Sequence, residues 1–377
     1  MIYPLFKVHV DIPEALKGIE KVLESGFINE GDQVTEFLNG MRVWVDGYPV
    51  LMNACTSALE TALHLLDLKD GDEIITTSMT CIATNTPIKN SLAKIVWADI
   101  NSKTGTLDPE SVEAAITDNT RAIMCMNWGG YPCDLKALRE ICDRYNLKLI
   151  QDSAHSFGAR YQRKFVDHFA DYTCFSFQAI KHLTTGDGGM LVCKDEKDAH
   201  RANSLKWFGI DREATKDEQG SWKGQAWDFD VLEAGFKYNM NNLSAAIGIT
   251  QLRKIRSIIS VHRRNASIYN EILDPAIGRL QYPKDAYPTC WVHTILTPEG
   301  TSVEDRDNII KQLNDDGIQA GLVHVPNHYY SCFKDEYVDL PETDKFYESQ
   351  ISLPCGWWLE KSEIVKIANK VNEYVLS

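Results

Sequence analysis

The chain has 377 residues and a formal net charge of −14, with 44% hydrophobic and 24% charged residues. This length allows a large domain and a smaller one, and the composition is that of an ordinary globular protein. The negative charge argues against nucleic acids and anionic membranes as partners, because it repels their phosphate groups.

The N-terminal segment lacks the basic start and sustained apolar core of a signal peptide, and no apolar run is long enough to span a bilayer. We therefore expect a cytoplasmic protein whose ten cysteines are reduced. Cys125 and Cys133 lie in one segment, but no second cysteine pair with a histidine completes a zinc site. We accordingly expect no structural metal.

Short apolar runs alternate with helical patterns through the first two-thirds of the chain. Strands are predicted at 73–78, 93–100, 121–128, 147–154 and 172–177. Between them, a helix is predicted at 134–146, where apolar residues recur at helical spacing. This alternation predicts an α/β fold with a mostly parallel sheet covered by helices on both faces.

The last third of the chain has a different pattern. A long helical region at 244–273 is followed by a strand at 290–298 and by helices at 303–317 and 361–375. This order predicts a smaller α+β domain at the C-terminus. We place the large domain at 1–255 and the small domain at 256–377, with the long helical region at their junction.

A lysine follows one of the predicted strands directly. The segment 174–192 reads CFSFQAIKHLTTGDGGMLV, and it places Lys181 in a polar, glycine-rich turn. Burial next to a strand lowers the pKa of a lysine and makes its amine nucleophilic, which suits a lysine that forms an imine. On this segment alone, an ordinary surface lysine explains the pattern equally well.

An aspartate ends another predicted strand, in the segment LIQDSAHSFGARY. A carboxylate at the position of Asp152 suits a cationic ring nitrogen, such as the pyridinium of pyridoxal phosphate (PLP). His155, three residues later, could stack on such a ring or support Asp152. The alternative is that Asp152 caps the N-terminus of a helix.

Hydroxyl groups lie at the start of a third element. The segment NACTSALETALHLL has helical spacing from Ala58 onward, with Thr56 and Ser57 at its start. A helix N-terminus with hydroxyls and free amides is suited to bind a phosphate, and Ser176 could add another hydroxyl. Taken alone, this is only a capped helix.

Five motifs, which follow one another along the chain, contain these residues. They read CTSAL, GDEIITTSMTCIATNTPI, IQDSAHSFGA, SFQAIKHLTTGDGG and GFKYNMNNLSAAIGITQL. Together they resemble the DegT/DnrJ/EryC1/StrS family of sugar-nucleotide aminotransferases over nearly the whole chain. The resemblance implies the fold of type I PLP enzymes and a homodimer with active sites at the subunit interface.

The resemblance also implies roles for the residues singled out above. Lys181 would bind pyridoxal 5′-phosphate as a Schiff base, and Asp152 would pair with its ring nitrogen. His155 would lie beside the ring. The residues expected to hold the phosphate are Thr56, Ser57 and Ser176.

The implied reaction has two half-transfers. An amino donor, expected to be L-glutamate, gives its nitrogen to the cofactor, and the ketone of a nucleotide-linked keto-sugar then accepts it. We expect a 4-keto-6-deoxy sugar carried by dTDP, with GDP or UDP as the carrier, or amination at carbon 3, as alternatives. A PLP-dependent sugar dehydratase is disfavoured, because such relatives have histidine at the lysine position and Lys181 is present here.

Three positions depart from the family pattern. Cys81 lies where some relatives have an aromatic residue over the ring, and Asn239 replaces a frequent arginine. Lys237 lies where many relatives have an asparagine that reaches the phosphate of the neighbouring subunit. We expect Lys237 to serve that phosphate as a point charge.

Candidates for binding the nucleotide-sugar are aromatic and basic residues. Aromatic faces suit stacking on sugars and bases, and arginine suits a diphosphate. For the tryptophans, packing in the core is the alternative. The candidates are Trp207, Arg212 and His324, together with Trp222, Trp227 and His328.

Overall fold

The computed structural model describes residues 2–211 and 229–377. Its centre is a seven-stranded sheet, and all of its strands except β11 run in the same direction. A mostly parallel sheet is confirmed. The strands in spatial order are β1 (Tyr48–Met52), β11 (Gly189–Cys193), β10 (Tyr172–Ser176), β7 (Lys148–Asp152), β6 (Thr120–Met126), β2 (Glu73–Thr77) and β3 (Lys94–Ala98).

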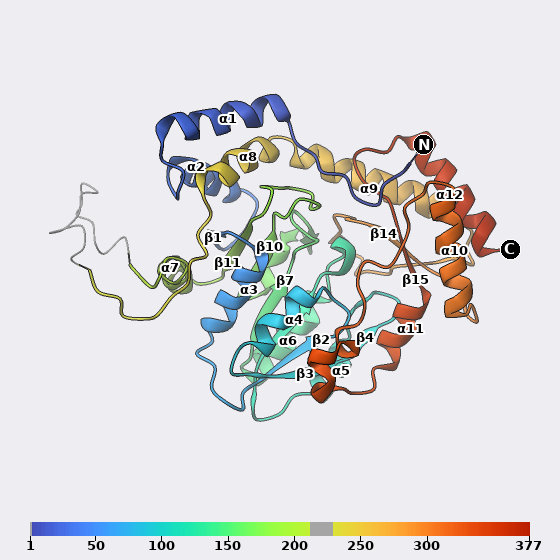
Figure 1. The fold of residues 1–377 in the computed structure, drawn as a ribbon. Helices are drawn as coiled ribbons and strands as arrows, with labels where there is room; N and C mark the ends of the chain where they lie inside the picture. The colour runs from blue at the N-terminus through green and yellow to red at the C-terminus, as the bar shows by residue number, and fades with distance from the viewer. Residues whose placement is uncertain (1, 212–228) are drawn as a thin grey trace.

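Helices cover both faces of this sheet (Figure 1). Successive strand residues point to opposite faces, so that Ile74 and Ile75 of β2 belong to two different cores. The helices on the side of Ile74 are α3 (Cys55–His64), α4 (Ile82–Lys89) and α7 (Glu196–Leu205). Those on the side of Ile75 are α2 (Asp32–Met41), α5 (Pro109–Ala114) and α6 (Leu135–Tyr145).

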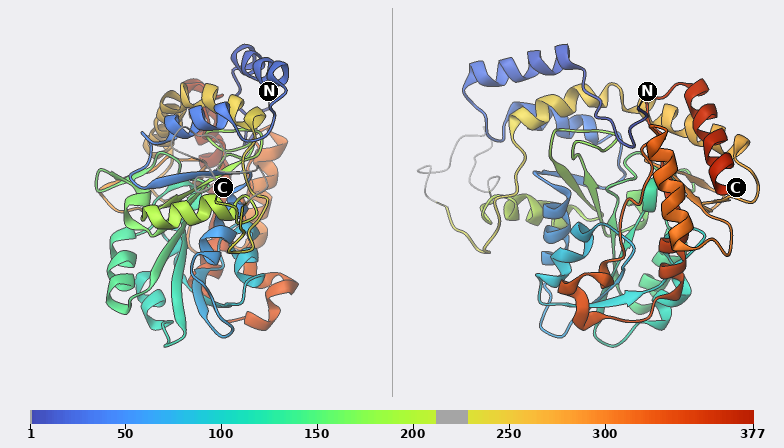
Figure 2. Two further views of the ribbon diagram at one scale, coloured as in Figure 1. Left: turned by 90° about the vertical axis from the view of Figure 1, so that its left-hand side faces the viewer. Right: turned by 45° about the vertical axis from the view of Figure 1, so that its right-hand side comes forward.

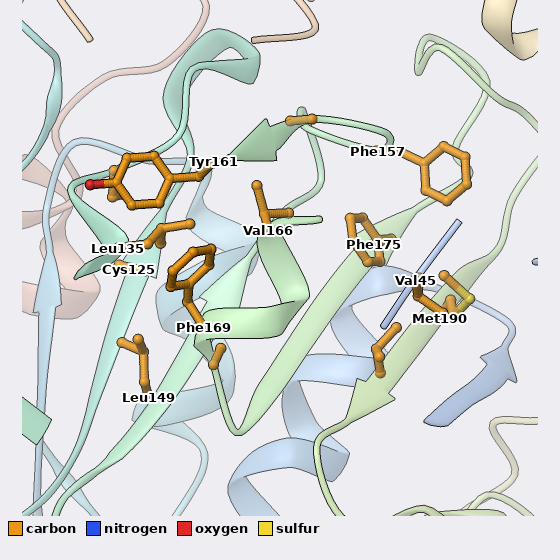
Figure 3. Packing of buried hydrophobic residues seen from close by; sticks show 14 of the residues in the cluster. Val45, Cys125, Leu135, Leu149, Phe157, Tyr161, Val166, Phe169, Phe175 and Met190 are labelled. Atoms are coloured by element: carbon orange, nitrogen blue, oxygen red, sulfur yellow. The ribbon is translucent and has the colours of Figure 1, made fainter. Parts of the chain in front are cut away.

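The core on the side of Ile75 continues beneath a small hairpin. The two strands β8 (Arg160–Tyr161) and β9 (Lys164–Phe165) pair with each other, and β8 also pairs with β13 (Ala286–Tyr287). Figure 3 shows Phe157, Tyr161 and Phe175 among the buried side chains of this cluster. The segment after Asp152 is therefore anchored on the sheet by large apolar side chains.

The predicted helical region at 244–273 forms two helices, α8 (Asn242–Leu252) and α9 (Ile255–Ile272). Helix α8 packs against α2 and against α1 (Ile12–Ser25), as Figure 2 shows. Helix α9 contributes Ile259 to the core beneath the hairpin and Ile268 to a separate C-terminal core. It therefore contributes to both of these cores.

The C-terminal part has an antiparallel sheet of β12 (Gly278–Arg279), β14 (His293–Leu296) and β15 (Gln350–Leu353). Helices α10 (Val303–Asp315), α11 (Pro341–Ser349) and α12 (Lys361–Val375) complete it. Tyr3 pairs with Ile318, so the N-terminal segment also packs here. The division of the chain at 255/256 stays a prediction.

The remaining elements are short. They are β4 (Ile100–Asn101), β5 (Thr106–Leu107) and the 3₁₀ turns at Trp128–Gly130, Val166–Phe169, Asn327–Tyr329 and Ser331–Glu336. Within the described ranges, each helix is either too short or too polar to cross a membrane.

Candidate active site

Lys181 lies in the loop that joins β10 to β11. Its side chain is half-buried, and its Nζ lies 3.8 Å from the centre of the Trp291 ring. The indole Nε1 of Trp291 donates a hydrogen bond of 2.9 Å to the carbonyl oxygen of Ile180, which holds the ring beside the lysine. Burial lowers the pKa of Lys181 to about 8, against the opposing effect of Asp152. A usable fraction of the amine is therefore neutral and nucleophilic near neutral pH.

Asp152 is buried at the carboxyl end of β7, where it pairs with Cys174 of the neighbouring β10. Its Oδ2 accepts a hydrogen bond of 2.6 Å from the Thr84 hydroxyl, and its Oδ1 accepts one of 2.9 Å from the amide of Ala154. Burial raises the pKa of Asp152, and the two hydrogen bonds and Lys181 oppose that rise. A turn follows β7, so Asp152 is not a helix cap.

His155 and His324 form an aromatic wall together with Trp291. The ring of His155 stacks on Trp291 with a centroid distance of 3.8 Å, and the ring of His324 lies parallel to His155 at 5.5 Å. Burial lowers the pKa of His155 well below its usual value and that of His324 to about 3, so both rings are neutral. Within the described residues, His155 Nδ1 and His324 Nε2 have no hydrogen-bond partner.

The N-terminus of α3 meets the strand that follows the Lys181 loop. The helix begins at Cys55, three residues before the predicted Ala58, so that Thr56 and Ser57 lie in its first turn. Gly189 of β11 pairs with Ser176 of β10, and a Cβ on Gly189 would lie only 2.3 Å from the backbone of Ala54. The absence of a side chain at 189 thus brings Ser176 and the start of α3 close together.

Lys237 lies near this helix start within the same chain. Its carbonyl oxygen accepts a hydrogen bond of 3.3 Å from Asn53 Nδ2, and Asn53 Oδ1 accepts one of 2.7 Å from the Ser57 hydroxyl. The Nζ of Lys237 lies 4.0 Å from the ring centre of Trp207 and donates to Asn239. Trp207 therefore serves as a platform for Lys237. Arg212, Trp222 and Trp227 lie outside the described residues.

Hydrogen bonds hold the segment 324–328 against the loop after β2 and against α4. His328 Nδ1 and the Ser78 hydroxyl are 2.6 Å apart, and Asn85 Nδ2 donates a hydrogen bond of 2.9 Å to Asn327 Oδ1. His328, a candidate for binding the nucleotide-sugar, is buried and bonded to Ser78 in this way. These contacts hold His324 next to His155.

Two residues of this arrangement, Thr84 and Trp291, were not predicted from the sequence. Thr84 lies inside the quoted motif GDEIITTSMTCIATNTPI, but only the helical turn of α4 shows that its hydroxyl reaches Asp152. Trp291 comes from the other end of the chain, 110 residues after Lys181. It lies within the strand predicted at 290–298, and that pattern gave no indication of a contact with Lys181.

The residues present fit pyridoxal phosphate. Among the described residues, the buried carboxylate of Asp152 accepts hydrogen bonds from an uncharged hydroxyl and an amide, so a protonated ring nitrogen would supply a hydrogen-bonded positive charge. His155 and His324 each have a ring nitrogen without a hydrogen-bond partner among the described residues. Both rings lie close enough to Lys181 for its charge to lower their pKa values. The first turn of α3 with Ser176 suits the phosphate.

Comparisons with known proteins agree with this arrangement. Residues 10–372 match the DegT/DnrJ/EryC1/StrS aminotransferase family. GDP-perosamine synthase from Escherichia coli O157:H7 is 32% identical over 327 residues, which cover 87% of this chain and 85% of that protein. The crystal structure of AtS13 from Actinomadura melliaura is 34% identical, with a TM-score of 0.91 over 99% of this chain and 98% of that one.

The sugar aminotransferase CalS13 from Micromonospora echinospora is 28% identical, with a TM-score of 0.90 over 99% of this chain and 100% of that one. These similarities confirm the type I fold, the use of PLP and the action on a nucleotide-linked sugar. The chain belongs to the DegT/DnrJ/EryC1/StrS aminotransferase family.

Proposed function

We propose that the chain aminates carbon 4 of a nucleotide-linked 4-keto-6-deoxy sugar and takes the nitrogen from L-glutamate. The observation that carries this proposal is the placement of Lys181, whose pKa is lowered to about 8, near the buried carboxylate of Asp152, beyond the carboxyl ends of the paired strands β10 and β7. In the overall exchange, the sugar ketone becomes an amine and glutamate becomes 2-oxoglutarate.

Each side chain would have a defined task. PLP, when bound, supplies an electron sink for breaking a carbon–hydrogen bond next to nitrogen. Lys181 would hold the cofactor through Nζ and, once released, take up and return a proton at that nitrogen. Asp152 would keep the ring nitrogen protonated, and the Thr84 hydroxyl would keep the carboxylate in place.

The remaining groups would bind and shield the cofactor. Thr56, Ser57 and Ser176 would hold its phosphate at the start of α3. His155 would lie beside its ring, backed by Trp291, and this aromatic wall would exclude water from the reacting carbon.

For the nucleotide we propose dTDP, as the resemblance implies, with GDP as the second candidate. The second candidate rests on one observation, the 32% identity to a GDP-perosamine synthase over most of both chains. Trp207 and His324 are proposed to contact the substrate, since Trp207 lies against Lys237 and His324 stacks on His155. Arg212 keeps the same proposed role.

The test is to incubate the purified, PLP-loaded enzyme with L-glutamate and dTDP-, GDP- and UDP-linked 4-keto-6-deoxy sugars. Mass spectrometry would detect the amino sugar, and NMR would show which carbon bears the nitrogen. We expect amination at carbon 4 with the dTDP substrate. Amination at carbon 3, or no turnover with any of the sugars, would contradict the proposal.

We also propose a homodimer, and one feature of the structure supports it. Ile12, Leu16 and Leu23 on α1 are 63%, 59% and 55% exposed, which is an apolar surface suited to a second copy. Lys237 would serve the cofactor phosphate of the neighbouring subunit. For Lys237→Ala we expect faster loss of PLP in dilute protein, whereas a loss that does not depend on protein concentration would place Lys237 in its own subunit's site.

A further inference from the structure

A pocket of about 480 Å³ lies away from Lys181, between the β8–β9 hairpin, α9 and Tyr287. Its lining includes four arginines and no acidic residue. None of the four forms an ion pair with a carboxylate of the described chain, although the protein has a net charge of −14. The pocket is therefore a concentrated positive site in an acidic protein. The four are Arg160, Arg163, Arg256 and Arg263.

The fold directs these guanidinium groups to one place. Arg256 and Arg263 lie seven residues apart on α9, with Ser260 between them on the same face of the helix. In β8 the side chain of Tyr161 is buried beneath the hairpin (Figure 3), so the neighbouring Arg160 points to the opposite face.

Aromatic rings hold three of the arginines. The distances from guanidinium to ring centre are 4.1 Å for Arg160 and Phe165, 5.3 Å for Arg256 and Trp44, and 5.5 Å for Arg263 and Tyr287. Arg263 also donates hydrogen bonds to the carbonyl oxygens of Pro288 and Tyr287. These contacts orient the cations without neutralising them.

The fourth arginine occupies an unfavourable backbone position. Gln162 and Arg163 form the two-residue loop of the hairpin with φ values of +48° and +67°. Such a turn favours Asn–Gly, because side chains crowd the backbone at positive φ. The backbone at Arg163 is therefore locally strained where its guanidinium lines the pocket.

We infer that this pocket binds a nucleoside diphosphate at a second site, separate from the one around Lys181. Guanidinium groups recognise phosphate oxygens through paired hydrogen bonds, and four of them suit two adjacent phosphates. Tyr287 is 55% exposed at the edge of the pocket, so that its ring offers a surface on which a base can stack. The volume lies within the range of small-molecule sites.

The two sites are on different sides of one helix. His262 of α9 lies 4.6 Å from the ring of His182, next to Lys181, whereas the adjacent Arg263 faces the pocket. Arg263 also binds the carbonyl of Pro288, one residue before Thr289, whose hydroxyl donates to the carbonyl oxygen of His155. Arg263 would thus link a bound ligand to the segment Pro288–Thr289, which is hydrogen-bonded to His155 in the site around Lys181.

The experiment uses the PLP-loaded enzyme and calorimetric titration with UDP, GDP, dTDP and inorganic pyrophosphate. A photoreactive azido derivative of the nucleotide that binds then locates the site by mass mapping. The informative variant is Arg163→Gly, because glycine adopts the strained backbone freely and the protein should keep or raise its unfolding midpoint. The matched control is Arg253→Gln, which removes an exposed arginine that lies 3.6 Å from Glu14.

We expect cross-links within residues 158–165, 256–263 or 287, and binding of pyrophosphate about tenfold weaker than that of the nucleotide. Arg163→Gly should weaken binding at this site by about tenfold, since it removes a charge-assisted contact, whereas Arg253→Gln should leave it unchanged. Cross-links confined to the surroundings of Lys181 would overturn the inference. So would equal affinity for pyrophosphate, or loss of oligomers in Arg163→Gly without any change in nucleotide binding.

Discussion

The close approach of Gly189 to α3 predicts the effect of a single methyl group. In Gly189→Ala the new Cβ would lie 2.3 Å, 2.4 Å and 2.5 Å from backbone atoms of Ala54 and Cys55, where ordinary contact begins at 3.4 Å. Since backbone cannot rotate away, the start of α3 must move by about 1 Å, and such overpacking costs about 1–3 kcal/mol of unfolding free energy. The first turn of α3 would then no longer match the phosphate.

We expect Gly189→Ala to lower the urea midpoint and to weaken PLP binding, measured by titrating the apoenzyme and following cofactor absorbance. A displacement of about 1 Å in a positioned group is enough to reduce turnover by about 10²-fold. The control is Gly321→Ala, because a Cβ at 321 meets no atom within 4 Å and its backbone is not in the left-handed region. Unchanged PLP affinity in Gly189→Ala would refute the role of the α3 start.

Three further changes test the site and the core. Lys181→Ala should fold normally by circular dichroism yet form no amino sugar by NMR, and substantial turnover would remove its proposed role. Asp152→Asn should lower kcat by about 10²-fold or more, because it loses the charge that keeps the ring nitrogen protonated. A near-normal kcat would mean that the ring nitrogen has another partner. His293 is buried without hydrogen-bond partners among the described residues, and burial lowers its pKa from 6.5 to about 3. It stays neutral in the folded state and takes up a proton on unfolding, so it reduces the unfolding free energy as pH falls below 6.5, by up to about 1.4 kcal/mol per pH unit. His293→Phe should therefore stabilise more at pH 5 than at pH 8, measured by urea unfolding, and an equal shift at both would contradict this reasoning.

Five of the seven strands of the central sheet were predicted from the sequence as short apolar runs, whereas β1 and β11 were not predicted. The strand expected at 73–78 forms β2 at Glu73–Thr77, and that expected at 172–177 forms β10 at Tyr172–Ser176. The prediction of one helical region at 244–273 was only partly right, since Arg253 and Lys254 separate two helices there. Apolar spacing continues across that break, so periodicity alone does not reveal it.

The site was predictable only where neighbouring strands bring its members together. Asp152 ends β7 and Lys181 follows β10. These two strands pair in the sheet, and both residues were expected in one site because of the resemblance. Trp291 comes from the C-terminal part and reaches Lys181 only through tertiary packing. No local pattern encodes such a contact, because it depends on how α9 places the two parts of the chain.

Burial shifts the pKa values of Lys181 and Asp152 in opposite directions, and from this we expect the bound cofactor to stabilise the fold. It lowers the pKa of the lysine and raises that of the aspartate, so that the charged form of each is disfavoured in the apoprotein. A protonated ring nitrogen would give Asp152 a counter-charge, and a ligand that binds only the folded state stabilises it. The gain in unfolding free energy on adding PLP should consequently be smaller in Asp152→Asn than in the unmodified chain. An equal gain would mean that the phosphate contacts at α3, rather than the buried carboxylate, couple the cofactor to folding.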